Sequence, residues 1–185
     1  MTTYVMLYDG FANFEVVMPM YLLKTACQVK TVGMTKDAVK SLEGLTVIPD
    51  MIVEEVRLLE EDVLIIPGGD PEVLNGQEAF YDLIRQGNDA KTLLAAICAG
   101  PVHLAKAGVL EGKEYTTSHP HDEASPFDPD LYVKKNVVVD DHIVTAQPSG
   151  YVEFGIVLGQ LMDIYQDDDD LEETVRFFMD FEIQG

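Results

Sequence analysis

Three short apolar runs constrain the fold of this chain more than any other feature of its sequence. They are Tyr4–Tyr8, Val63–Ile66 and Thr92–Ile97, and none of them carries a polar residue at every second position. A half-exposed strand alternates in that way, whereas a strand buried on both faces reads as a continuous apolar run. The pattern therefore predicts a parallel sheet with helices on both faces.

Helical patterns alternate with the predicted strands. Phe14–Ala26 follows the first run, Val102–Ala107 follows the third, and Val152–Tyr165 is apolar almost all round, as in a well-buried helix. The 185 residues contain no linker or repeat that would divide the chain. We therefore predict one domain over residues 1–185, with an α/β fold in three layers around a mostly parallel sheet.

Several shorter segments also have patterns that predict secondary structure. Val39–Val53 contains Gly44 and Pro49 between β-rich pieces, which indicates a hairpin-like excursion. The aspartate run Asp167–Asp170 precedes a last helix and suits the positive end of its dipole. Short strands are expected at Tyr115–Thr117, Val137–Val139 and Ile143–Ala146.

Charge and cysteine content limit the partners and the compartment. The chain has 12 Lys and Arg against 33 Asp and Glu, a formal net charge of −21. Such a surface repels phosphate backbones and anionic lipids, so we expect neither nucleic acid nor membrane as a partner. The sequence begins without a basic region, and no apolar segment is long enough to span a bilayer. Cys27 and Cys98 cannot build a disulfide framework, so we expect reduced thiols in a soluble, unexported, cytoplasmic protein.

Residues suited to chemistry gather where the predicted strands end. In an open α/β sheet, ligands bind beyond the carboxyl ends of the strands. Four segments interrupt the chain at such ends, and between them they hold Glu15, Gly68, Gly69, Cys98, His119 and His121. We therefore expect a small-molecule site at this edge of the sheet.

Cys98 has the sequence context of a nucleophile elbow, Ala96-Ile97-Cys98-Ala99-Gly100. The small flanking residues allow a sharp strand-to-helix turn that holds the side chain up at the sheet edge. The following helix directs N–H groups and its positive dipole end at the sulfur, so we predict a depressed pKa for the thiol. The alternative is a buried structural cysteine, which is our interpretation of Cys27 in its apolar helix.

Backbone amides and one carboxyl group are candidate partners of the sulfur. The N–H groups of Gly68, Gly69 and Ala99 could form an oxyanion hole, although a glycine pair also suits an ordinary turn. Glu15 is set between apolar neighbours, and burial beside a thiolate would raise its pKa and make it a proton donor. The alternative for Glu15 is a helix-start glutamate that favours the dipole.

His119 and His121 follow a predicted strand within a polar segment. One of them could act as a general base for Cys98, and a solvated loop is the alternative. With a carboxylate they could form a metal site, but their spacing matches no strong zinc pattern, so no metal is expected. The chain also lacks a Gly-x-x-x-x-Gly-Lys loop and a Gly-x-Gly-x-x-Gly motif after a strand, so we expect no nucleotide cofactor.

The elbow and several other segments resemble the ThiJ/PfpI superfamily and occur in the family's order. The matching pieces are Asp9-Gly10 with Glu15, Leu64–Gly69, Ala96–Pro101, Thr116–Pro120, and Thr145–Gly150 followed by Glu153-Phe154. The resemblance implies a flavodoxin-like sandwich related to class I glutamine amidotransferases, usually assembled as a homodimer. It also implies Cys98 as the nucleophile, Glu15 as its hydrogen-bonded acid, and sensitivity of Cys98 to oxidation.

Two departures from the family's pattern, and one difference from the isonitrile hydratase relatives, narrow the expected function. Ala99 stands where the protease-like branch has a histidine, so a peptidase triad built on that neighbour is absent. Ser118 adds one residue between a threonine pair and His119, which leaves open whether His119 or His121 faces the sulfur. Glu15 stands where isonitrile hydratase relatives generally carry aspartate, which disfavours that activity.

The resemblance and the site residues together predict a cysteine-dependent enzyme that acts on small reactive carbonyls. The expected reaction is glyoxalase-like or deglycase-like, with Cys98 as the nucleophile and Glu15 or His119 moving protons. One alternative is a redox-responsive stress protein with an oxidisable Cys98 and little turnover. Another is an amidase-like or amidotransferase-like hydrolase, which the lack of a histidine next to Cys98 disfavours.

Overall fold

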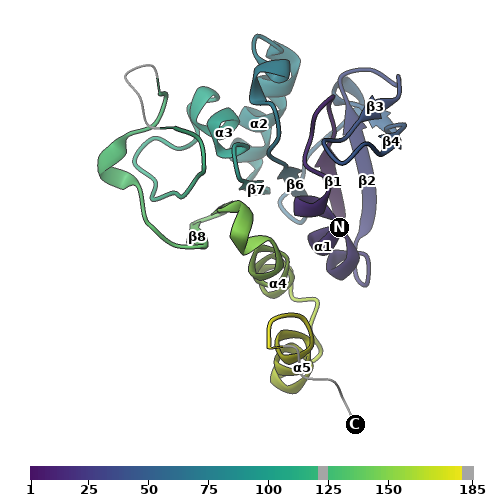
Figure 1. Cartoon of the computed structure of the whole chain (residues 1–185), viewed down its shortest axis with the longest axis vertical. Helices are drawn as coiled ribbons and strands as arrows, with labels where there is room; N and C mark the ends of the chain where they lie inside the picture. Colours follow the sequence, from purple (N-terminus) through teal and green to yellow (C-terminus); the bar gives the residue numbers. More distant parts are fainter. Residues whose placement is uncertain (121–124, 181–185) are drawn as a thin grey trace.

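A central seven-stranded sheet runs through the molecule in the order β5-β2-β1-β6-β7-β9-β8 (Figure 1). The structure is a computed structural model and describes residues 1–120 and 125–180. In sheet order the strands are Met51–Ile52 (β5), Gln28–Gly33 (β2), Thr2–Met6 (β1), Val63–Ile66 (β6), Leu93–Ile97 (β7), Ile143–Ala146 (β9) and Val137–Asp140 (β8). Every neighbouring pair is parallel except β9 with β8, so the predicted mostly parallel sheet is confirmed.

The inner strands are buried along their whole length. All four residues of β6 and all five of β7 are shielded from solvent. Val5 of β1 pairs with Thr31 of β2 on one side and with Ile65 of β6 on the other. Because helices cover both faces at these strands, neither face selects for polar side chains, and the sequence shows no alternation there.

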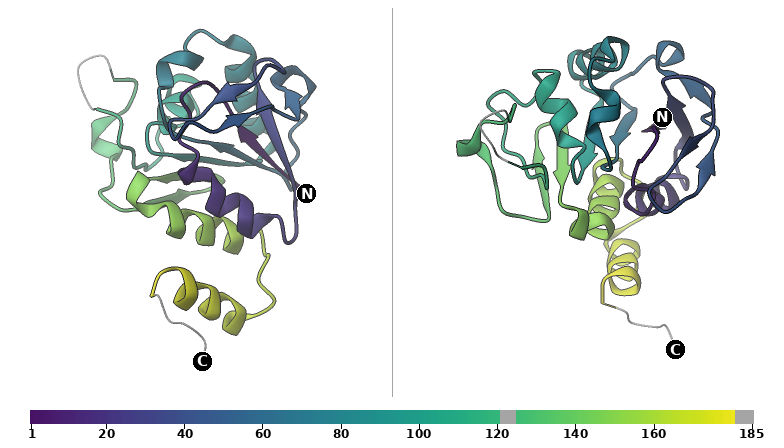
Figure 2. Two further views of the ribbon diagram at one scale, coloured as in Figure 1. Left: turned by 45° about the vertical axis from the view of Figure 1, so that its right-hand side comes forward. Right: turned by 45° about the horizontal axis from the view of Figure 1, so that its top comes forward.

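Helices form the two outer layers of the sandwich. They are α1 (Phe14–Leu23), α2 (Glu78–Ala90), α3 (Pro101–Lys106), α4 (Tyr151–Leu161) and α5 (Asp168–Phe178). Figure 2 shows α1 and α4 side by side on one face of the sheet, with α2 and α3 on the other. A Cβ atom on Gly155 would lie 3.1 Å from the backbone nitrogen of Pro19, so glycine allows α4 to pack closely on α1. The predicted three-layer α/β sandwich is confirmed.

The last helix, α5, lies outside α4 (Figure 2). Within Asp168–Phe178 no residue is fully buried. The Asp167 side chain caps the helix, since its Oδ1 accepts a hydrogen bond from the N–H of Asp170 at 2.9 Å. Asp168, Asp169 and Asp170 occupy the first turn, so the aspartate run lies at the positive end of the helix dipole, as predicted.

Two of the shorter predicted segments have opposite outcomes. The hairpin is confirmed, because β3 (Val39–Lys40) and β4 (Thr46–Val47) form an antiparallel pair. The predicted strand at Tyr115–Thr117 is wrong, because only Tyr115 makes an isolated bridge, to Tyr132. Instead, the Thr116 N–H donates to the Thr145 hydroxyl in β9, and the Thr117 hydroxyl donates to the carbonyl oxygen of Cys98 after β7.

Two predicted helices end earlier than their apolar patterns do. Helix α1 ends at Leu23 and α4 ends at Leu161. After α4, Asp163 has a φ of 52°, and this left-handed backbone terminates the helix. The described residues also form four short 3-10 helices: η1 (Val53–Glu55), η2 (Pro71–Leu74), η3 (Pro129–Leu131) and η4 (Pro148–Gly150).

Candidate active site

Cys98 lies in a sharp turn between β7 and α3, at the carboxyl edge of the sheet. Its φ of 63° is in the left-handed region, which is unfavourable for any residue but glycine. The Cys98 N–H donates to the carbonyl oxygen of Ala146 at 2.8 Å, so the residue is held at the end of β9 while the chain reverses. The side chain is half-buried.

Two glycines let this turn approach the end of β6. A Cβ atom on Gly68 would lie 2.5 Å from the Cβ and 2.7 Å from the Sγ of Cys98. A Cβ atom on Gly100 would lie 2.5 Å from the carbonyl oxygen of Ile66. Both separations are shorter than real Cβ contacts, so a side chain at either position would displace the turn that holds the sulfur.

Glu15, in the first turn of α1, is buried against the sulfur. Only 1% of the residue is exposed. Its carboxyl group shares a hydrogen bond with the Cys98 thiol, and its Oε2 accepts the Gly68 N–H at 2.7 Å. Burial raises the pKa of Glu15, and the two hydrogen bonds only partly oppose that shift. The raised pKa agrees with the sequence prediction for this carboxyl group.

Burial also raises the pKa of Cys98, to about 11. Hydrogen bonds from the Ser118 hydroxyl and the Ala99 N–H lower it, whereas the negative charge of Glu15 raises it further. The sequence-based prediction of a depressed pKa is therefore wrong. Loss of hydration around the sulfur outweighs the donors at the start of α3, a helix of only 6 residues.

The protons of Cys98 and Glu15 are coupled because the two groups share a hydrogen bond. An ionised Glu15 repels a thiolate and accepts the thiol proton, and both effects raise the pKa of the thiol. When the carboxyl group carries the proton, it becomes a donor to the sulfur and both effects are lost. A thiolate beside a protonated carboxyl is thus the form of the pair that suits nucleophilic attack.

The three predicted oxyanion donors differ in their environments. The Gly68 N–H is bound to Glu15, so the prediction that it is a free oxyanion donor is wrong. Gly69 has a φ of 121°, and a Cβ there would lie 2.1 Å from the carbonyl oxygen of Gly10, so glycine is required at this position. The Ala99 N–H is directed at the Cys98 sulfur. An oxyanion role for Gly69 and Ala99 remains a prediction.

The predicted histidine base does not contact the sulfur. The Nδ1 atom of His119 lies 3.1 Å from the carbonyl oxygen of Pro120, and its ring packs edge-on against Phe127 at 6.0 Å between centroids. Within the described residues, no hydrogen bond joins this ring to Cys98. His121, the other candidate, lies outside the described residues.

The side chain found on the sulfur is Ser118, whose Oγ donates to Cys98 Sγ at 3.2 Å. The sequence signal for it was the extra residue before His119, which moves the histidine one position beyond the sulfur. Tyr8 is a second residue that the sequence prediction missed. It is buried, and its hydroxyl donates to the carbonyl oxygen of Gly68 at 2.8 Å, which fixes the turn behind Glu15. Because Tyr8 ends an apolar run, its pattern indicates only a core residue.

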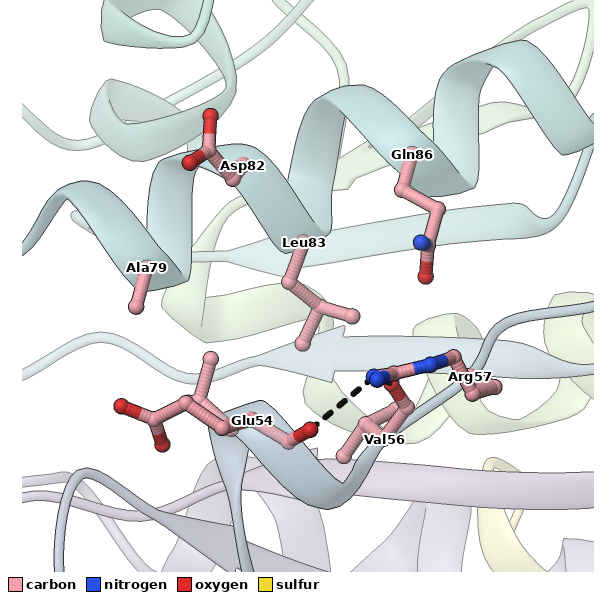
Figure 3. Close-up of a pocket in the computed structure, with 8 residues that line it drawn as sticks. Glu54, Val56, Arg57, Ala79, Asp82, Leu83 and Gln86 are labelled. Carbon is pink, nitrogen blue, oxygen red and sulfur yellow. Dashed lines mark hydrogen bonds between the residues drawn. The ribbon is translucent and has the colours of Figure 1, made fainter.

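Two of the hollows at the surface of the described chain lie apart from Cys98. The pocket in Figure 3, about 280 Å³ in volume, lies between η1 and α2, where Arg57 donates to the carbonyl oxygen of Glu54 at 2.9 Å. None of the residues that line it takes part in the contacts around Cys98. The other hollow, about 540 Å³, is lined mainly by apolar side chains of α1, the start of α4 and the end of α5.

Metal and membrane features were sought throughout the described chain. Over residues 1–120 and 125–180, no cluster of three or more His, Cys, Asp or Glu side chains could hold a metal ion. No helix in these two ranges is long and apolar enough to cross a membrane.

Known proteins resemble this chain over most of its length. The Deglycase TK1284 of Thermococcus kodakarensis is 28% identical over 144 residues, covering 77% of this chain and 87% of the relative. The Glutathione-independent glyoxalase DJR-1.2 of Caenorhabditis elegans is 26% identical over 147 residues, covering 77% of each chain. The crystal structure of a thiJ/pfpI family protein from Bacillus anthracis has the same fold, with a TM-score of 0.83 at 22% identity, covering 97% of this chain and 91% of that one.

The sequence profile of the DJ-1/PfpI family matches residues 1–158, and this range includes the strand ends, Glu15, the Cys98 turn and Ser118. The resemblance that the sequence motifs predict is thereby confirmed. The chain belongs to the DJ-1/PfpI family.

Proposed function

We propose that this chain is an enzyme in which the Cys98 sulfur attacks small reactive carbonyl compounds, with 2-oxoaldehydes as the substrate class. The observation that carries the proposal is the hydrogen-bonded pair of Cys98 and the buried Glu15 at the carboxyl edge of the sheet. A carboxyl group with a raised pKa can take the thiol proton and return it to the substrate without exchange with bulk water.

In the first step the thiol proton moves to Glu15, and the resulting thiolate attacks the aldehyde carbon. A carbon–sulfur bond forms, and the electron pair of the carbonyl π bond moves to oxygen. That oxygen takes the proton from Glu15, which gives a neutral hemithioacetal and an ionised carboxyl group. The N–H groups of Gly69 and Ala99 would stabilise the oxygen while its charge develops.

A glyoxalase-like outcome follows by moving two more protons. The Glu15 carboxylate takes the proton from the former aldehyde carbon while the keto oxygen gains a proton, which gives an enediol. The hydroxyl on the sulfur-bearing carbon then loses its proton as the former keto carbon gains one. The product is a thioester of a 2-hydroxy acid, which water hydrolyses to the free acid and the Cys98 thiol. The aldehyde carbon is oxidised and the keto carbon is reduced, so the reaction needs no external oxidant.

A deglycase-like outcome differs in the starting compound. The aldehyde then arrives as a hemiaminal with an amine, and the amine leaves as the carbonyl reforms and reacts with Cys98. Relatives named as a deglycase and as a glutathione-independent glyoxalase support this range of activities. The second name fits a reaction in which the protein supplies the thiol.

Two alternatives have less support from the geometry. Oxidation requires the Cys98 thiolate to attack a peroxide oxygen, and burial raises the pKa of Cys98 to about 11, which disfavours a purely redox-responsive role. An amidase-like or amidotransferase-like role lacks a base at Ala99, and Ser118 rather than a histidine binds the sulfur.

We also propose that the protein forms a homodimer through α1. Phe14, Val17 and Tyr21 on this helix are 46%, 49% and 51% exposed. They border the apolar hollow between α1, α4 and α5. Apolar side chains grouped in this way on one face are typical of an interaction surface.

Replacement of Cys98 tests the proposed reaction. We expect Cys98→Ala to lose methylglyoxal consumption and 2-hydroxy acid formation by at least about 100-fold, because the nucleophile is removed. Cys27→Ala is the matched control, since Cys27 is buried in the core away from the site and should retain activity. Consumption by Cys98→Ala at the parent rate would overturn the proposal.

A further inference from the structure

A short polar segment is clamped to the turn that holds Cys98. The Ser118 N–H donates to the carbonyl oxygen of Cys98 at 2.9 Å, and the Thr117 hydroxyl donates to the same oxygen at 2.8 Å. These two bonds fix the segment relative to the sulfur. They also direct the Ser118 hydroxyl onto Sγ, at 3.2 Å.

The same segment is anchored from behind. The Gln147 side-chain amide donates to the Thr116 hydroxyl at 2.8 Å and to the Thr117 carbonyl oxygen at 2.7 Å. The Thr116 N–H donates to the hydroxyl of Thr145 in β9 at 2.9 Å. Thr116, Thr117 and Thr145 are all buried, so the rigid sheet determines the position of Ser118.

We propose that Ser118 is a catalytic residue whose hydroxyl donates a hydrogen bond to the Cys98 thiolate, at the position where the sequence predicts a histidine base. Its part in turnover rests on the proposed function, but its effect on the sulfur does not. A hydroxyl group does not titrate near neutral pH, so Ser118 stabilises the charged sulfur without taking its proton. Within the described residues, Glu15 is then the titratable group that hydrogen-bonds the sulfur.

This arrangement has a consequence for reactivity. A donor to the thiolate increases the fraction of Cys98 that is ionised at neutral pH, and it also lowers the nucleophilicity of each thiolate. Removal of the hydroxyl should therefore slow the reaction of Cys98 at neutral pH.

Alkylation of Cys98 by iodoacetamide as a function of pH tests the proposal. The experiment uses full-length chains that carry Cys27→Ala, so that Cys98 is the only thiol. We expect Ser118→Ala to react about threefold more slowly at pH 7, because an upward shift of about one unit in the apparent pKa of the thiol lowers the ionised fraction about tenfold while the nucleophilicity of each thiolate rises about threefold. Ser118→Thr keeps a hydroxyl and should restore most of the parent rate. Ser118 is exposed, so Ser118→Ala should fold like the parent, and circular dichroism checks this.

His119→Ala is the matched control, because its ring does not bind the sulfur, and it should follow the parent profile. The proposal is overturned if the Ser118→Ala profile superimposes on that of the parent, or if His119→Ala shifts the profile as much. Alkylation measures the sulfur without turnover. A parent that consumes no methylglyoxal while Ser118→Ala still shifts the profile would therefore overturn the proposed function and support the role of Ser118.

Discussion

Folding transfers Glu15 from water to a site where only 1% of the residue is exposed. Burial raises the pKa of its carboxyl group, so the folded chain binds this proton more tightly than the unfolded chain does. The free energy of unfolding therefore falls as the pH rises from the ordinary glutamate pKa through the raised, folded-state pKa. Loss of the Glu15 proton thus lowers the stability of the fold at higher pH.

The Glu15→Gln variant tests the contribution of Glu15 to the pH dependence of stability and its contribution to turnover. The amide keeps the shape of the side chain and can still accept the Gly68 N–H, but it does not titrate. We expect the free energy of unfolding of the variant to rise relative to that of the parent as the pH increases from about 4 to about 8. Turnover of methylglyoxal should fall by about 100-fold or more, because the proton carrier is lost.

Urea unfolding at several pH values measures the pH dependence of the free energy of unfolding. Glu54→Gln is the control variant. Glu54 is exposed at η1, beside the pocket of Figure 3, so its replacement should not change the pH dependence. Parallel stability curves for Glu15→Gln and the parent across this range would show that Glu15 has no raised pKa in the folded chain.

The neighbourhood of Glu15, Gly68 and Cys98 can be predicted from sequence because all three follow strands that end at one sheet edge. Two of the predictions that were wrong, His119 on the sulfur and a depressed pKa of Cys98, depend on distances of a few ångströms. One inserted residue, Ser118, determines whether a hydroxyl or an imidazole reaches the sulfur. The direction of the Cys98 pKa shift depends on how much water the folded chain removes, which a short sequence pattern does not encode.

At the scale of elements, the β3–β4 hairpin caps the helix that carries Glu15. The Asn13 side chain does not cap α1. Instead, Glu43 at the tip of the hairpin accepts the Asn13 N–H at 3.1 Å and the Phe14 N–H at 3.0 Å. A carboxylate at this end also interacts favourably with the helix dipole. The β3–β4 hairpin thus fixes the first turn of the helix that positions the Glu15 carboxyl group.

We expect Glu43→Ala to destabilise the fold by about 1 kcal/mol, which is typical of a lost helix cap. The melting temperature should fall by about 2–4 °C for a chain of this length. Differential scanning calorimetry measures the shift, with Glu60→Ala as the control at an exposed carboxylate in the turn before β6. If both variants melt at the parent temperature, the hairpin contact does not stabilise α1.

The same scale shows which elements are predictable from sequence. β6 and β7 are fully buried, and their continuous apolar runs identify them. Tyr115–Thr117 has a similar β-rich composition, but within the described residues it forms no ladder beyond the isolated bridge of Tyr115. Its threonines bind Thr145 and the Cys98 turn instead. A pattern within one segment carries no information about whether a partner strand is present.

At the scale of the whole molecule, net charge and exposed apolar surface have opposite effects on the association of two copies. The net charge of −21 makes two copies repel one another at low ionic strength. The exposed apolar side chains of α1 lose water when they pair, which favours association. Salt screens the repulsion and leaves the apolar attraction in place. Added salt should therefore strengthen a dimer formed through α1, whereas it would weaken one held by ion pairs.

Val17→Glu tests this assembly, because it places a further negative charge in the centre of the proposed interface, at a side chain that is 49% exposed. Sedimentation equilibrium should show a parent dimer that tightens as salt rises from about 0.05 M to about 0.5 M, and a variant that stays monomeric. Leu59→Glu adds the same charge at a 54% exposed leucine before β6 and should remain dimeric. If Val17→Glu dimerises as tightly as Leu59→Glu, α1 is not the interface.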